Sequence, residues 1–373
     1  MNNLNIGITG DKGFIGSHLS IAINYFNDNL TFVPSPNKLF EDQNSLNSFV
    51  KKCDVIVHLA AMNRGDDSQI FQTNITLIKQ LIKAIQKDDS KNKHVIFASS
   101  TQRELNNSYG KSKKEGEKLL KTWKFNSNGT LTNLIIPNVF GPFCKPFYNS
   151  VISTFCYQIN EGEIPEIKID AEIGYKYIDN LVEVIIDAIN GKFDSEEVFV
   201  KPDKKIKVSE ILSRLEAFKN SYILKNIIPK IKSNFDIDLF NTFRSYIKYD
   251  KLLFKLDLKK DDRGTLFEIV KEMTGGQAFF STTKPGIVRG NHFHTKKIER
   301  FCVVSGEAKI CLRKINSNNV IKYKVSGDSP VVIDMPIFHT HNIENIGKSN
   351  LLTLFWSNEI YDENNPDTFF EEV

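Results

Sequence analysis

The sequence lacks the signals expected of a secreted, membrane-spanning or disulfide-bonded protein. Its N-terminus has no basic segment leading into a hydrophobic stretch, and no apolar run approaches the roughly 20 residues that a membrane-spanning helix needs. The chain has five cysteines, an odd number, and no Cys-x-x-Cys pair. This composition favours reduced, buried thiols over a disulfide framework. We therefore expect a cytoplasmic protein without a membrane segment.

Neither sign of charge dominates the sequence. The 49 basic and 45 acidic residues leave a net charge of +4 and are mixed along the chain. This mixing weighs against a dedicated nucleic-acid surface, whereas an anionic nucleotide would suit a slightly basic protein. Hydrophobic residues make up 40% of the 373 residues, which is typical of a globular protein long enough for two domains.

The spacing of apolar residues changes near residue 247. Before it, short apolar runs alternate with segments of helical spacing, which predicts a doubly wound α/β domain with a parallel sheet. The expected strands are Leu4–Ile8, Val55–Leu59, Val95–Ser99 and Leu131–Ile136, and the expected helices are Gly16–Phe26, Ile70–Gln86, Tyr109–Phe125 and Val208–Phe218. After Lys251, alternating runs punctuated by Gly, Pro and Asn predict an antiparallel β-barrel or sandwich. We place the two domains at residues 1–246 and 247–373.

A glycine-rich turn follows the first expected strand. Gly10, Gly13 and Gly16 come between Leu4–Ile8 and the first helix. Glycines at these positions permit a tight turn, close approach of the backbone to a pyrophosphate, and close packing of helix on strand. The helix N-terminus then favours negative charge. The strand-to-helix context favours a nucleotide site over an ordinary turn.

Tyr109 and Lys113 lie four residues apart and therefore share one face of a helix. A nearby ammonium favours the phenolate of a tyrosine, which can then exchange a proton with a carbonyl or an alcohol. Alone, the pair could be an exposed part of an amphipathic helix. Ser99 and Ser100, which end the preceding strand, add a hydroxyl that can hold a carbonyl oxygen.

Four of the seven histidines fall within fifty residues near the C-terminus. His292 and His294 alternate, so on a strand they would point to the same side. Glu299 follows after a turn, and His341 lies on a later strand-like segment. A His/His/Glu/His set suits a divalent cation such as Zn²⁺, Fe²⁺, Mn²⁺ or Ni²⁺, and we favour Zn²⁺. His339 is an additional histidine whose part in the site stays open.

The N-terminal residues resemble the extended short-chain dehydrogenase/reductase family, whose members work largely on nucleotide sugars. Besides the glycine turn and the Tyr/Lys pair, the resemblance rests on Asp54–Ala61 and Pro137–Pro142. It implies a catalytic set of Ser100, Tyr109 and Lys113. It also implies cofactor contacts from Tyr109, Lys113, Gly10, Gly13, Phe14, Ile15, Gly16, Leu59, Ala60, Ala61 and Asn74. The residues implied for the sugar-nucleotide pocket are Arg64, Asn138, Lys145, Asn149 and Ser150.

The second expected strand suggests which nicotinamide is used. Enzymes that use NAD generally end this strand with Asp or Glu, which binds the ribose hydroxyls. The stretch Thr31–Lys38 contains no acid, and Ser35 or Lys38 could instead meet a 2′-phosphate. We therefore expect NADPH.

The C-terminal residues resemble the cupin family over about residues 260 to 373. The resemblance rests on Gly290, His292, His294, Glu299 and Gly306, followed by Pro336, His341 and Asn345. In the second motif Phe338 stands where glycine is usual. The metal could take part in catalysis or only stabilise the barrel. A metal-free sugar epimerase with a histidine base is a third possibility.

A reductase fused ahead of a cupin resembles the bifunctional proteins of bacterial capsular polysaccharide synthesis in the UDP-N-acetyl-L-fucosamine pathway. Cys144–Ile152, His341–Asn345 and Pro366–Thr368 support this resemblance. It implies a UDP-linked 4-keto-6-deoxy amino sugar as substrate and a homodimer. The cupin would epimerise C3, and the N-terminal domain would reduce C4. The alternative is a dTDP-sugar 4-reductase with a structural or sugar-binding cupin.

Overall fold

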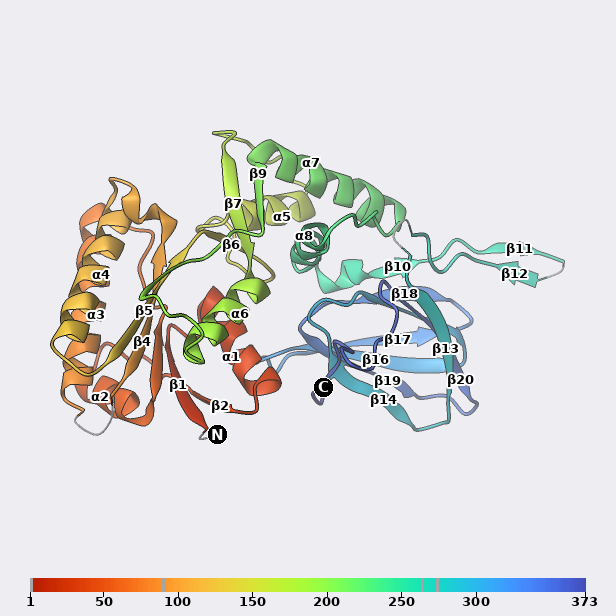
Figure 1. Ribbon diagram of the computed structural model, residues 1–373. Coiled ribbons are helices and arrows are strands. Elements are labelled where there is room, and N and C mark those ends of the chain that lie inside the picture. Colours follow the sequence, from red (N-terminus) through yellow and green to blue (C-terminus); the bar gives the residue numbers. More distant parts are fainter. Residues whose placement is uncertain (1–2, 89–91, 263, 273–274) are drawn as a thin grey trace. The chain divides into compact units, whose positions relative to one another are not determined.

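The computed structural model describes residues 3–88, 92–262, 264–272 and 275–373 (Figure 1). The chain divides into two compact units, one made of residues 1–154 and 169–208 and the other of residues 155–168 and 209–373. No helix among the described residues has both the length and the apolar character needed to cross a bilayer.

The first unit contains a parallel sheet of six strands in the order β2-β1-β3-β4-β5-β8. Its strands are β1 Leu4–Thr9, β2 Leu30–Val33, β3 Val55–His58, β4 His94–Ser100, β5 Thr130–Ile136 and β8 Glu197–Phe199. The helices are α1 Phe14–Phe26, α2 Gln43–Lys52, α3 Asp67–Gln86, η1 Thr101–Glu104, α4 Ser108–Phe125 and α6 Ile178–Ile189. A smaller sheet joins β6 Asn138–Phe140, β7 Glu172–Tyr177 and β9 Lys204–Lys207.

Helices cover both faces of the parallel sheet. Residues of α2, α3 and α4 form one buried cluster with apolar residues of the strands, including Phe49, Leu81, Trp123 and Val95. The helices α1 and α6 lie on the opposite face (Figure 1). This arrangement confirms the predicted doubly wound fold, in which the strand ends and the helix N-termini meet at one edge of the sheet.

The second unit contains two antiparallel sheets of five strands, β10-β18-β15-β20-β13 and β17-β16-β19-β14-β21. The strands are β10 Leu253–Lys255, β13 Gln277–Thr283, β14 Val288–Phe293, β15 Glu299–Ser305, β16 Glu307–Lys314, β17 Val320–Ser326, β18 Val331–Met335, β19 His339–Asn345, β20 Leu351–Ser357 and β21 Phe369–Phe370. A hairpin of β11 Lys259–Asp261 and β12 Gly264–Leu266 accompanies them. Apolar residues of both sheets, such as Phe301 and Ile310, pack into one core. The predicted all-β C-terminal fold is therefore confirmed.

Helical segments also belong to the second unit. They are most of α5 Val151–Glu161 and of α7 Val208–Phe218, the π-helix η2 Lys219–Ile223, α8 Asn234–Arg244, and the short 3-10 helix η3 Tyr249–Leu252. The sequence indicates helix over about residues 205 to 245, with the stretch 227–241 the harder part to assign. The structure begins α8 at Asn234, where the side chain of Ser233 caps the helix by accepting a hydrogen bond from the Asp236 amide.

Buried charges join these helical segments to the barrel. Arg300 on β15 and Asp334 on β18 are fully buried and form a two-pronged ion pair, with N–O distances of 2.6 and 2.9 Å. The hydroxyl of Tyr222, in η2, donates a further hydrogen bond to Asp334. Arg244 of α8 donates to the carbonyl of Met335 at 2.8 Å. Breaking such a buried pair leaves an uncompensated charge, so these contacts tie residues 219–244 to the barrel.

This attachment bears on the predicted domain boundary between residues 246 and 247. The compact units separate near residue 208 instead, because η2 and α8 pack on the barrel. The boundary between residues 246 and 247 remains a prediction. The division into compact units describes packing and does not test where the reductase domain ends in the sequence.

Candidate functional site

The turn between β1 and α1 has the backbone that its glycines predict. Gly10 has φ +79°, a left-handed conformation that favours glycine. A Cβ atom on Gly16 would lie 2.3 Å from the carbonyl oxygen of Gly10, so the helix can approach the turn only with glycine there. No side chain caps α1, whose N-cap is Gly13. The first amides of this helix are thus available to an anion.

A cavity of about 510 Å³ opens beside this turn. Its lining brings together three groups of predicted residues: the cofactor residues Gly10, Gly13, Phe14, Ile15, Gly16, Leu59 and Ala61, the catalytic residues Ser100, Tyr109 and Lys113, and the substrate residues Asn138, Lys145, Asn149 and Ser150. Residues that are more than a hundred positions apart in the sequence thus meet in one cavity. Its volume is that of a pocket for a small molecule or a cofactor.

Tyr109 and Lys113 lie together in the cavity, as their helical spacing predicts. The Lys113 ammonium lies 5.5 Å from the centre of the Tyr109 ring and donates a hydrogen bond to the carbonyl of Ala98 at 2.7 Å. Burial lowers the pKa of Lys113 to about 8, although Glu117 opposes the shift. Ser100 accepts a hydrogen bond from the amide of Gln102 at 3.1 Å, which starts η1.

The protonation of Tyr109 differs from the expectation based on Lys113. Burial, together with the nearby Tyr148, raises the pKa of Tyr109 to about 12. Burial thus favours the protonated phenol at neutral pH, because it disfavours the charged phenolate. A protonated phenol can donate a proton to a carbonyl oxygen.

Several predicted residues do not line the described cavity. Asn74 is buried and fully engaged: it accepts from the amide of Met62 at 2.7 Å and donates to the carbonyl of Met62 and the hydroxyl of Ser112. Ala60 lies behind Gly10, with its nitrogen 3.1 Å from the place of an added Cβ. Arg64 is exposed and outside the cavity lining. Asn74 does not face the cavity but joins two of its supporting segments, the loop after β3 at Met62 and the helix α4 at Ser112.

The end of β2 differs most from the sequence-based picture. The hydroxyl of Ser35 donates to the carboxylate of Asp11 at 2.6 Å, and its amide donates to the same group at 3.1 Å. Lys38 is exposed and pairs with Glu41 at 2.9 Å. Lys12, from the glycine turn, lines the cavity and contacts the side-chain oxygen of Asn37. The charged side chains in this region, Asp11 and Lys12, therefore come from the glycine turn and not from the end of β2.

The sequence analysis also missed side chains of the cavity wall. Asn63, Gln102, Phe143 and Tyr148 line it without having been predicted. Tyr148 lies within the stretch that suggested Lys145 and Asn149, so its position could have been found. Phe143 has φ +63°, an uncommon conformation for a residue with a side chain.

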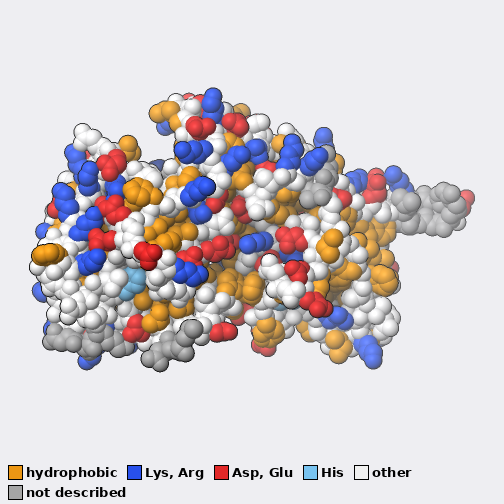
Figure 2. Space-filling view, viewed as in Figure 1, with side chains coloured by type: hydrophobic (Ala, Val, Ile, Leu, Met, Phe, Trp, Pro, Cys, Tyr) orange, Lys and Arg blue, Asp and Glu red, His pale blue; other side chains and the backbone are white. Residues whose placement is uncertain are grey.

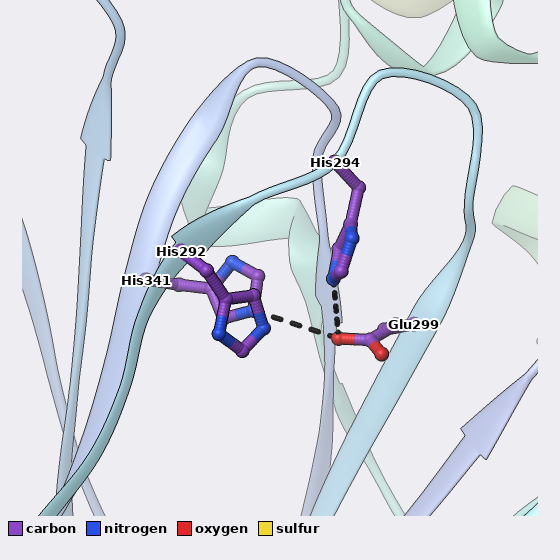
Figure 3. A group of neighbouring side chains, drawn as sticks. All are labelled: His292, His294, Glu299 and His341. Carbon is purple, nitrogen blue, oxygen red and sulfur yellow. Dashed lines mark ion pairs between the residues drawn. The ribbon is translucent and has the colours of Figure 1, made fainter. Parts of the chain in front are cut away.

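The second candidate site lies in the barrel, between its two sheets. His292 on β14 and His341 on β19 belong to one sheet, and Glu299 begins β15 of the other (Figure 3). His294 lies in the loop between β14 and β15. One ligand atom from each residue lies within 4.8 Å of all the others. The four residues predicted to bind a metal are thus brought together.

The donor set of this cluster fits a divalent cation. The Nε2 atoms of His294 and His341 lie 2.9 and 3.5 Å from the same oxygen of Glu299, as the dashed lines in Figure 3 show. Both nitrogens are buried without a hydrogen bond of good geometry. The Nδ1 atom of each ring contacts a backbone carbonyl oxygen, of Asp367 and of His339 respectively. This leaves Nε2 of each ring facing the centre of the cluster, where a metal would need a lone pair.

The ionisation of the cluster is consistent with metal binding. Burial, with the neighbouring His341 and His294, lowers the pKa of His292 to about 3, so this ring is neutral. Burial alone would raise the pKa of Glu299, but the close ion-pair contacts of its carboxylate with His294 and His341 hold it well below its usual range. One carboxylate with imidazole nitrogens is a ligand set suited to Zn²⁺ and similar ions.

His339 does not belong to the four-residue cluster. Its Nε2 contacts the hydroxyl of Tyr249 at 2.8 Å, and its Nδ1 contacts the carbonyl of Ile337 at 2.9 Å. Both ring nitrogens are therefore occupied by other partners.

Comparisons with known proteins cover both units. Residues 6–200 match the NAD dependent epimerase/dehydratase family, and residues 259–369 match the polysaccharide biosynthesis C-terminal domain. A Pseudomonas aeruginosa protein, UDP-2-acetamido-2,6-beta-L-arabino-hexul-4-ose reductase, is 30% identical over 368 residues, with 97% of each chain covered.

Two further relatives support the same division. The crystal structure of capsular polysaccharide assembling protein CapF from Staphylococcus aureus is 35% identical, covers 99% of this chain and 100% of its own, and superposes with a TM-score of 0.64. The spore coat polysaccharide biosynthesis protein SpsL from Bacillus subtilis is 25% identical over 123 residues, covering 30% of this chain and 82% of its own. The chain therefore belongs to the CapF-like family, in which an NAD-dependent epimerase/dehydratase domain precedes a polysaccharide biosynthesis C-terminal domain.

Proposed function

We propose that the chain is a bifunctional nucleotide-sugar enzyme that makes a precursor of capsular or surface polysaccharide, in the synthesis of UDP-N-acetyl-L-fucosamine. The C-terminal domain epimerises C3 of a UDP-2-acetamido-2,6-dideoxy-4-keto-hexose. The N-terminal domain then reduces C4 with NADPH to give UDP-2-acetamido-2,6-dideoxy-L-talose. The observation that carries the proposal is the cavity in which the glycine turn, Tyr109, Lys113 and the 138–150 segment meet. The full-length relative from P. aeruginosa, by its name a reductase of such a sugar, supports it.

The reduction needs a hydride on C4 and a proton on its oxygen. The backbone amides of the glycine turn would hold the pyrophosphate of NADPH, and this cofactor would supply the hydride. Tyr109 donates the proton to the oxygen, since its raised pKa keeps the phenol protonated until negative charge develops there. Lys113, fixed by the Ala98 carbonyl, stabilises the phenolate that remains. Ser100 orients the carbonyl with its hydroxyl.

The epimerisation uses the acidity that the C4 ketone gives to the C3 hydrogen. A base removes this proton, and a proton returns to the other face. His292, His294, Glu299 and His341 would hold a divalent cation, for which we propose Zn²⁺, and such an ion would supply Lewis-acid stabilisation of the enolate. The exchange is reversible while the ketone remains. Reduction at C4 removes the ketone and thereby traps the new configuration.

Fusion of the two domains has a kinetic consequence. Because both domains are parts of one chain, an intermediate released from the first site meets the second site at a high effective concentration. We also propose, from the sequence alone, that the protein is a cytoplasmic homodimer.

The competing function is a 4-reductase, acting on a dTDP-sugar, with a C-terminal domain that only binds sugar or is structural. One observation favours a single activity: the name of the P. aeruginosa relative mentions a reductase and no epimerase. Analysis of the products formed from UDP-linked and dTDP-linked keto sugars shows which of the two nucleotide sugars is the substrate.

The first prediction concerns proton donation by Tyr109. Tyr109→Phe should lower kcat for NADPH oxidation by about 100- to 10,000-fold, the usual contribution of a general acid. NADPH binding, measured by fluorescence titration, should stay largely intact, because the phenol acts on the substrate oxygen rather than on the phosphates. Tyr157→Phe on α5 is the matched control, since Tyr157 does not line the cavity. Turnover of Tyr109→Phe at the wild-type rate would rule out the assignment.

The second prediction concerns cofactor choice at the end of β2. We propose that Lys12 binds the 2′-phosphate, since Ser35 is bound to Asp11 and Lys38 to Glu41. NADPH should be preferred over NADH, and Lys12→Ala should raise KM for NADPH but leave KM for NADH unchanged. Lys38→Ala is the comparison variant. Only replacement of the lysine that binds the 2′-phosphate should raise KM for NADPH without changing KM for NADH. Equal or better kcat/KM with NADH in the wild type would show instead that Asp11 binds the ribose hydroxyls.

The third prediction concerns the metal. Elemental analysis should find about one divalent ion per chain in the wild type and none in His341→Ala, because the cation needs several ligands. Reduction of an already epimerised ketone should continue in the variant. His94→Ala in the first unit controls for loss of an imidazole. Full metal content in His341→Ala would contradict the site, whereas early melting with loss of the barrel would favour a structural metal.

A further inference from the structure

The last residues of the chain hold the loop that carries His294. The Asp367 carboxylate, 8% exposed, accepts four hydrogen bonds from this loop. The donors are the Thr295 amide at 3.0 Å, the Thr295 hydroxyl at 2.7 Å, the Lys296 amide at 2.9 Å and the Lys297 amide at 2.7 Å. In return, the Lys297 ammonium donates to the carbonyl of Pro366 at 2.7 Å. One carboxylate thus satisfies three consecutive amides.

The same segment contacts two candidate metal ligands directly. The carbonyl oxygen of Asp367 contacts Nδ1 of His294. Two residues later, β21 pairs with β14, where His292 lies opposite Phe370. The backbone of residues 367–370 therefore fixes His294 through its ring and His292 through the strand that carries it.

We propose that Asp367 is a positioning residue of the metal site: it presets His294 for the ion by fastening the 294–297 loop to the C-terminal segment. This inference rests on the proposed metal site. With Nδ1 held by a carbonyl, Nε2 is the ring nitrogen of His294 that is left for an ion, and it faces Glu299 at 2.9 Å. A histidine that binds a metal usually has its other ring nitrogen held in this way.

The energetic reason lies in the loop amides. Four residues separate His294 from Glu299, and three of them turn their amides toward Asp367. Without the carboxylate the buried amides of Thr295 and Lys297 would lack partners, which is costly enough to rearrange the loop. Binding of the ion would then have to order the ring of His294, and the free energy needed for this ordering would lower the affinity for the ion.

The test is a competition between a chelator and the full-length protein for Zn²⁺. Asp367→Ala should bind Zn²⁺ about 10- to 100-fold more weakly than wild type, the usual effect of losing a group that orients a ligand. The visible spectrum of the Co²⁺-loaded variant should also change. Asp328→Ala, an exposed aspartate on the turn after β17, removes the same charge from the same barrel and should leave affinity unchanged.

Stability measurements separate positioning from a merely structural role. Positioning predicts that Zn²⁺ raises Tm less in Asp367→Ala than in the wild type. Equal Zn²⁺ affinity and an equal increment in Tm, with a lower Tm in both forms, would overturn the proposal. If Asp367→Ala does not fold, Asp367→Asn provides the same comparison, since it keeps shape and one acceptor oxygen. Absence of Zn²⁺ binding in the wild type would instead refute the metal site itself.

Discussion

A carboxylate buried among three imidazoles is the constraint on which the C-terminal unit depends. Glu299 begins a strand of one sheet, and its oxygen faces two histidine nitrogens that lack well-formed hydrogen bonds. A buried charge without compensation is expensive, so this position must hold positive charge close to the carboxylate. The two sheets, the loop after β14 and the C-terminal segment all converge on it. A divalent cation satisfies the constraint with the ligand types that are present.

The N-terminal unit meets the opposite need, which is a place for negative charge. It does so with backbone rather than side chains: the turn at Gly10 and the uncapped start of α1 leave amides free, and Gly16 lets the helix lie close to the turn. The face of the molecule drawn in Figure 2 carries Lys and Arg side chains interspersed with acidic ones. Under the proposed function, selectivity for an anionic cofactor would come from the turn and individual residues such as Lys12, and not from a uniformly basic surface.

The sequence predicted those parts of the sites that depend on local spacing. Glycines at fixed intervals, Tyr109 and Lys113 one turn apart, and His292 and His294 around a strand end are all patterns within a few residues. The missed features depend on contacts between distant segments. Nothing near Ser35 shows that Asp11 binds it, and nothing near His294 shows that Asp367 holds its loop 73 positions later. The raised pKa of Tyr109 likewise reflects burial, which the Tyr/Lys spacing does not reveal.

The central claim is that two chemistries on one chain act in succession on one keto sugar. The most direct measurement is NMR of the UDP-linked 4-keto substrate with the full-length protein in D₂O, without nicotinamide. An epimerase working ahead of the reductase predicts that deuterium enters C3 while the C4 ketone persists, and that added NADPH then converts the labelled sugar into a reduced product. No deuterium at C3, with NADPH still consumed, would contradict the account and leave a reductase with a non-catalytic second domain.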